Sequence, residues 1–153
     1  MKFLMPDEKS VLAMLGALFG DDTSVTAAAK QDQPSDWVAT FVTDDNTLVA
    51  ACVCTKEFVA YAGAALMMLP AAQAKKAAAD GNVCEVTTGS FHEIMNICSR
   101  FLMNDHTPHL RLGQVCRRGD AAGFAELEKA GSRKDFKIAI PKYGSGQLAC
   151  VVT

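Results

Sequence analysis

Apolar residues recur every three or four positions in several stretches of the chain, which is the spacing of a helix with one buried face. The first stretch opens with Pro6, which favours a helix start, and Gly20 ends it. The most regular apolar stripe consists of Phe91, Ile94, Met95, Cys98, Phe101 and Leu102. The predicted helices are residues 6–19, 56–69, 71–79, 90–103 and 119–130.

Runs of β-branched and apolar residues, separated by turn-forming residues, predict strands between these helices. The turn at residues 43–47 joins two such runs and predicts a β-hairpin. A second hairpin is expected around the glycine-containing turn at residues 143–146. The polar residues 31–36 are expected to form a loop. The predicted strands are residues 24–30, 37–42, 48–54, 110–116, 136–140 and 148–152.

The two halves of the chain repeat one order of elements. A helix, a strand and a hairpin follow one another from Pro6, and the same order begins again at Ser90. The length of 153 residues suits one hydrophobic core, and no linker divides it. We therefore predict a single α/β (α+β) domain over residues 1–153, with two helix–strand–hairpin pseudo-repeats around one antiparallel sheet.

Charge and hydropathy exclude two classes of partner. Fifteen basic residues against 17 acidic residues give a net charge of -2, and no segment forms a basic stripe, so nucleic acid is not expected as the main partner. The apolar run at residues 58–69 is too short to span a bilayer, and the first residues lack the hydrophobic stretch of a signal peptide. We expect a cytoplasmic protein that does not enter a membrane.

The cysteines and histidines do not form a metal-binding motif. All six cysteines lie in apolar segments and are expected to be free thiols buried in the core. His92 and Glu93 resemble the start of a zinc-binding helix, but Asn96 stands where the second histidine is needed. Cys52 and Cys54 share a strand face without further ligands nearby in the sequence. No metal site is predicted, so a metal-dependent hydrolase lacks its ligands.

A polar row lies opposite the apolar stripe of the helix predicted at residues 90–103. Glu93, Asn96 and Arg100 are spaced i, i+3 and i+7, and Ile97 lies beside them. An acid, an amide and a base around one apolar residue suit the docking of a partner. A second interpretation is that Ser90 and Glu93 form a capping box at the helix start, with Asn96 as a solvated polar residue. The residues alone leave both interpretations open.

The segment from Glu93 to Ser99, with the sequence EIMNICS, resembles the E-x-x-N-I-x-S signature helix of the CheC/CheX/FliY chemotaxis phosphatase family. The hairpin and the Ala/Gly-rich helix over residues 38–69 also match the family's order of elements. The resemblance implies a fold of two α/β pseudo-repeats. It also implies that the signature helix enters the active site of a phosphorylated response regulator such as CheY.

The same resemblance implies roles for two residues of the row. Glu93 would pair with a lysine of the regulator, and Asn96 would orient a water molecule against the aspartyl phosphate. In the docking interpretation given above, Ile97 and Arg100 would contact the partner. The regulator supplies the magnesium ion, so no cofactor of the chain's own is expected. The alternative is a noncatalytic binding module that docks a signalling partner through the same helix face. The oligomeric state stays open, a homodimer included.

Overall fold

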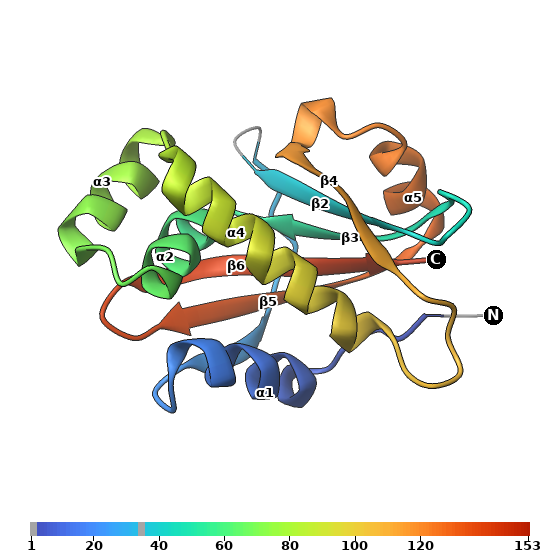
Figure 1. The fold of residues 1–153 in the computed structure, drawn as a ribbon, viewed down its shortest axis with the longest axis horizontal. Helices are drawn as coiled ribbons and strands as arrows, with labels where there is room; N and C mark the ends of the chain where they lie inside the picture. The colour runs from blue at the N-terminus through green and yellow to red at the C-terminus, as the bar shows by residue number, and fades with distance from the viewer. Residues whose placement is uncertain (1–2, 34–35) are drawn as a thin grey trace.

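In the computed structural model, which describes residues 3–33 and 36–153, helices pack on both faces of one six-stranded sheet (Figure 1). The strands are β1 (Ser24–Ala28), β2 (Trp37–Val42), β3 (Leu48–Cys54), β4 (Arg111–Arg117), β5 (Ser132–Ile140) and β6 (Gly144–Val152). The α-helices are α1 (Glu8–Phe19), α2 (Lys56–Leu66), α3 (Ala71–Asp80), α4 (Glu85–Cys98) and α5 (Phe124–Ala130). Two 3-10 helices, η1 and η2, cover Ser99–Leu102 and Arg118–Asp120.

The sheet has the strand order β1-β5-β6-β3-β2-β4, and its neighbouring strands are antiparallel. The hairpin β2–β3 of the first half pairs with β4 of the second half. The hairpin β5–β6 of the second half pairs with β1 of the first. The two hairpins meet at the centre, where β3 pairs with β6. The predicted antiparallel α/β arrangement is therefore confirmed, and each half completes the sheet of the other.

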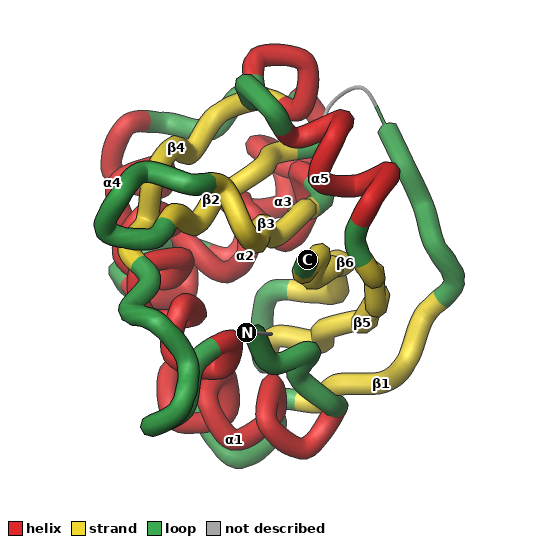
Figure 2. The backbone as a smooth tube through the Cα atoms, turned by 90° about the vertical axis from the view of Figure 1, so that its right-hand side faces the viewer, coloured by secondary structure: helices red, strands yellow, loops and turns green. Residues whose placement is uncertain are grey.

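The two faces of the sheet have separate apolar clusters because alternate residues of a strand point to opposite sides. Cys150 belongs to the large cluster under α1, α2 and α4, whereas Ala149 and Val151 belong to the smaller cluster under α5. Figure 2, which looks along the strands, shows α4 and α5 on opposite sides of the sheet. No helix among the described residues is long and apolar enough to span a membrane.

Small residues let α2 and α4 approach each other closely. A Cβ atom added to Gly63 of α2 would lie 2.6 Å from the backbone oxygen of Thr87 in α4. Such a distance is far shorter than a normal contact, so only glycine fits there. Helix α2 ends at Leu66, earlier than predicted, and Met68 in the following turn has a positive φ of 56°.

The structure corrects the predicted start of the helix at residues 90–103. Helix α4 begins at Glu85 and ends at Cys98, where η1 continues the chain. Ser90 lies buried within the helix, and its hydroxyl donates a hydrogen bond to the backbone oxygen of Val86 at 3.0 Å. Ser90 is therefore not an N-cap, and the capping-box interpretation is wrong.

The second hairpin and the last helix also differ from the predictions. Strand β5 begins at Ser132, and β6 begins at Gly144, so most of the predicted turn is strand. The chain reverses at residues 141–143, where Lys142 has a φ of 72°. Helix α5 covers only Phe124–Ala130, because η2 and a turn occupy the residues before it.

Candidate functional site

Glu93 and Asn96 lie on the exposed face of α4, one turn apart. Ile97 is half-buried beside them, and Arg100 is exposed. The opposite side of this segment, including Ile94, Cys98 and Phe101, is buried in the main core. The predicted division between an apolar stripe and a polar row is therefore confirmed.

Arg100 does not continue the helix that carries Glu93 and Asn96. It belongs to η1, which has about three residues per turn instead of 3.6. The spacing i, i+3 and i+7 on one α-helix therefore holds only as far as Ile97. Arg100 follows the pair closely in the chain. Its side chain does not lie directly in line with those of Glu93 and Asn96, as it would on one continuous α-helix.

The core side of α4 holds this face in place. The ring of Phe91 packs edge-on against Trp37 and Phe58, with ring centroids 6.3 Å and 6.4 Å apart. The Ser99 hydroxyl donates to the backbone oxygen of Asn96 at 2.8 Å, which satisfies a carbonyl of the last helical turn. The backbone beneath the two polar side chains is thus fixed by packing and by a hydrogen bond.

The side chains of Glu93, Asn96 and Arg100 form no hydrogen bond or ion pair with any other described residue. Their polar atoms are available to a partner without breaking an internal contact. Sequence reasoning missed two further residues of this face, because it began the helix at Ser90. Val86 is 52% exposed, and a Cβ atom added to Gly89 would contact nothing within 4 Å. The open face therefore extends from Val86 to Ile97.

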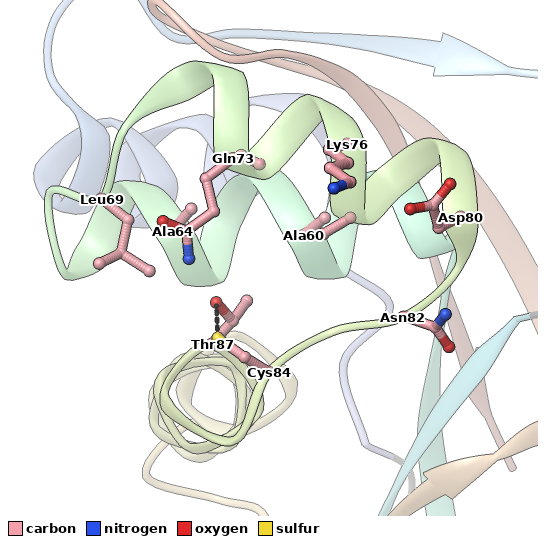
Figure 3. Close-up of a pocket in the computed structure, with 11 residues that line it drawn as sticks. Ala60, Ala64, Leu69, Gln73, Lys76, Asp80, Asn82, Cys84 and Thr87 are labelled. Atoms are coloured by element: carbon pink, nitrogen blue, oxygen red, sulfur yellow. Dashed lines mark hydrogen bonds between the residues drawn. The ribbon is translucent and has the colours of Figure 1, made fainter.

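A pocket of about 280 Å³ lies next to the start of α4, between α2, α3 and α4 (Figure 3). Cys84 is the N-cap of α4, and its Sγ atom lies 3.3 Å from Oγ1 of Thr87. Hydrogen bonds from the Thr87 side chain and backbone lower the pKa of the Cys84 thiol. Cys84 is exposed, so the prediction of burial is wrong for this cysteine.

The other cysteines show what burial does to a thiol. Cys52, Cys54, Cys98 and Cys150 are buried, and Cys116 is partly buried. Burial raises the pKa of Cys54 and of Cys98. All six cysteines are free. Among the described residues, no group of three or more His, Cys, Asp or Glu side chains is arranged to hold a metal ion.

Comparisons with known proteins match this chain by structure and not by sequence. No protein-family model matches it, and no curated protein matches it. The crystal structure of FliY from Thermotoga maritima matches with a TM-score of 0.58 and 13% sequence identity, over 98% of this chain and 91% of that one. The CheX-CheY-BeF3-Mg+2 complex from Borrelia burgdorferi matches with a TM-score of 0.43 and 12% identity, over 92% of this chain and 90% of the matched chain. The chain therefore has the fold of FliY, as the sequence resemblance to the CheC/CheX/FliY family predicted.

Proposed function

We propose that this chain binds the phosphorylated receiver domain of a response regulator and accelerates the loss of its aspartyl phosphate. The observation that carries the proposal is the pair Glu93 and Asn96, which project one turn apart from a fixed helix and have no partner among the described residues. The spacing of this pair is also that of the family's signature helix, which the sequence resembles.

Hydrolysis of an aspartyl phosphate requires few catalytic groups from the phosphatase. An aspartyl phosphate is an activated acyl phosphate, so placing a water molecule in line with the phosphorus supplies most of the catalysis. The side-chain amide of Asn96 can accept and donate hydrogen bonds, and it does not repel the phosphoryl oxygens. Glu93 offers a carboxylate to a cationic side chain of the regulator. The magnesium ion belongs to the regulator.

The surroundings of the pair leave room for this approach. Met95 and Cys98, the residues that flank Asn96 on the other side of the helix, are fully buried and do not reach the partner. Gly89 adds no side chain to the surface before Glu93, and Val86 and Ile97 add apolar area. An amide and a carboxylate bordered by apolar residues form a compact docking face.

Replacing Asn96 by alanine tests the catalytic step. We expect Asn96→Ala to slow the accelerated dephosphorylation about 10²-fold or more, because the water loses its positioning. The fold should persist, since an exposed helical residue tolerates alanine. The measurement is the decay of receiver domains from the same genome, phosphorylated with acetyl phosphate. Asn82→Ala removes an exposed amide away from this face and should leave the decay rate unchanged.

Replacing Glu93 tests docking. Glu93→Ala should weaken binding to the same phosphorylated receiver and leave the free energy of unfolding within about 0.5 kcal/mol of wild type, because Glu93 is a surface residue within the helix. Binding of the wild type without faster decay would overturn the catalytic proposal and leave a noncatalytic docking module. Absence of binding to every receiver domain would overturn both.

A further inference from the structure

A second pocket lies where the start of α2 meets β5 and β6, away from the exposed face of α4. Its volume is about 230 Å³, and most of the residues that line it are polar. They are Gln31, Thr55, Glu57, Lys137, Ser145, Gly146 and Gln147. A water molecule takes up roughly 30 Å³ in the liquid, so the pocket has room for a small organic molecule.

The pocket is built by close contacts between α2 and β6. A Cβ atom on Gly146 would lie 2.4 Å from the backbone nitrogen of Phe58, so glycine is required where the strand meets the helix. The Thr55 hydroxyl accepts hydrogen bonds from the backbone nitrogens of Phe58, at 3.3 Å, and Gln147, at 3.0 Å. The Thr55 backbone nitrogen in turn donates to the carbonyl of Gln147 at 3.1 Å. These bonds fix the backbone on two sides of the pocket.

Two acceptor atoms at this pocket lack donors. Oε2 of Glu57 and Oε1 of Gln147 are buried and form no hydrogen bond in the structure. Buried polar atoms are almost always hydrogen-bonded, and an unpaired one costs free energy. The Thr55 hydroxyl accepts from two backbone nitrogens, and its own O–H group donates to neither of these oxygens in the structure. The two oxygens therefore favour a bound group with several N–H donors.

A cation faces the same pocket from the neighbouring strand. Lys137 of β5 is in register with Gln147 of β6, so their side chains share a face of the sheet. Lys137 forms no ion pair within 4.0 Å of Glu57 or of any other described carboxylate. The pocket thus presents a carboxylate and an ammonium group that are not neutralised by each other.

We propose that this pocket binds a free amino acid, or a small zwitterion of the same kind. The ligand ammonium group donates to Glu57 and Gln147, and the ligand carboxylate pairs with Lys137. A simple amine would satisfy the two oxygens but leave Lys137 without an anion. A simple carboxylic acid would leave both oxygens unpaired.

The test is a titration of the full-length, nitrogen-15-labelled protein with the common L-amino acids, followed by NMR. We expect at least one amino acid to give saturable shifts at millimolar concentration for residues 55–58, 137 and 145–147. Its N-acetyl derivative and its decarboxylated amine should both bind much more weakly, because each lacks one of the two charges. Shifts at these residues that are equal for all three compounds would overturn the proposal.

Conservative variants check that the charges act as described. Glu57→Gln and Lys137→Gln should each weaken binding about 10-fold or more. The matched controls are Glu85→Gln, an acid in the first turn of α4, and Lys75→Gln, an exposed lysine of α3. Both controls should bind like the wild type. If no amino acid gives saturable shifts, or if Glu57→Gln binds as tightly as wild type, the pocket holds only water and the proposal is wrong.

Discussion

Cys84 and Cys98 lie at the two ends of α4 in opposite chemical environments. Cys84 caps the exposed start of the helix, where hydrogen bonds from Thr87 stabilise the thiolate and lower the pKa. Cys98 is enclosed by the core, where burial penalises the charge and raises the pKa. Alkylating reagents attack the thiolate, so the two cysteines should react at very different rates.

We expect one cysteine to be alkylated rapidly in the native protein, and mass spectrometry after brief iodoacetamide treatment should locate it at Cys84. The rate of alkylation should begin to rise at a lower pH than it does for an unperturbed cysteine, because the pKa of Cys84 in the folded protein is lowered. Thr87→Val removes the hydroxyl and should shift this rise to higher pH. First labelling at Cys98 or Cys54 would contradict this assignment. After unfolding, all six thiols should react.

Helices α2 and α4 depend on glycine in different ways. Gly63 is pressed against Thr87, so its lack of a side chain permits the helix contact. Gly89 faces open space on α4, where a glycine only loosens the helix. Glycine therefore stabilises the contact between α2 and α4 at position 63, whereas it weakens α4 itself at position 89.

Alanine at these two positions should have opposite effects on stability. Gly63→Ala forces the helices apart and should lower the free energy of unfolding by about 1–3 kcal/mol. Gly89→Ala should raise it by about 0.5–1 kcal/mol, because alanine favours the helix and meets no neighbour. Urea unfolding of both variants measures the two changes. A loss of stability in Gly89→Ala would show that α4 is not open at this position.

The sequence predicted the existence of most elements but not all of their limits. The apolar stripe located the core face of α4, because a helical period survives in the residues themselves. Its start was misplaced, because the N-cap residue is Cys84, a residue type that rarely caps helices, whereas serine, the residue at position 90, is a typical cap. The start of β5 was missed, because Arg133 and Asp135 interrupt its apolar pattern and pair with each other.

At the scale of the whole molecule, Arg133 joins segments that are far apart in the sequence. Its guanidinium donates to both carboxylate oxygens of Asp135, at 2.9 Å and 3.0 Å. It also donates to Asp32, at 3.0 Å, and to Glu128 of α5, at 2.6 Å. Arg133 is only 10% exposed, so solvent screens these pairs weakly. One side chain thus links β5, α5 and the segment after β1.

Arg133→Ala should lower the free energy of unfolding by about 3–5 kcal/mol, because it leaves the buried carboxylate of Asp135 without its partner. Lys30→Ala removes an exposed charge that lies 3.6 Å from Asp32 and should cost under about 1 kcal/mol. Urea unfolding compares the two variants. Equal losses would mean that Arg133 contributes no more than a surface charge.

The same network predicts a pH dependence. Burial opposes ionisation of Asp32, but Arg133 and Arg118 outweigh it and lower the pKa of this carboxyl below its ordinary value near 3.8. A lowered folded pKa stabilises the protein above the unfolded value, and this contribution is lost as the pH falls through the folded pKa. The stability difference between wild type and Arg133→Ala should therefore shrink in acid, as urea unfolding at several pH values would show.

The order of strands in the sheet could not be predicted from the sequence. Periodicity identifies strands one at a time, but it carries no information about which strands become neighbours. The repeated order of elements suggested two halves around one sheet. It did not show that β1 and β4 would each pair with the hairpin of the other half. That arrangement depends on contacts between residues far apart in the chain, such as Ser24 and Ala139.

The exchange of strands between halves also determines the order in which a growing chain can fold. When β1 leaves the ribosome, its only neighbour in the described sheet, β5, has not yet been synthesised. The hairpin β2–β3 can form early, but the outer edge of β3 stays unpaired until β6 has been synthesised. Closing such long loops before native contacts form is slow, so we expect refolding in milliseconds to seconds instead of microseconds. Until the last hairpin arrives, the unpaired strand edges are sites where a chaperone would be needed to prevent aggregation.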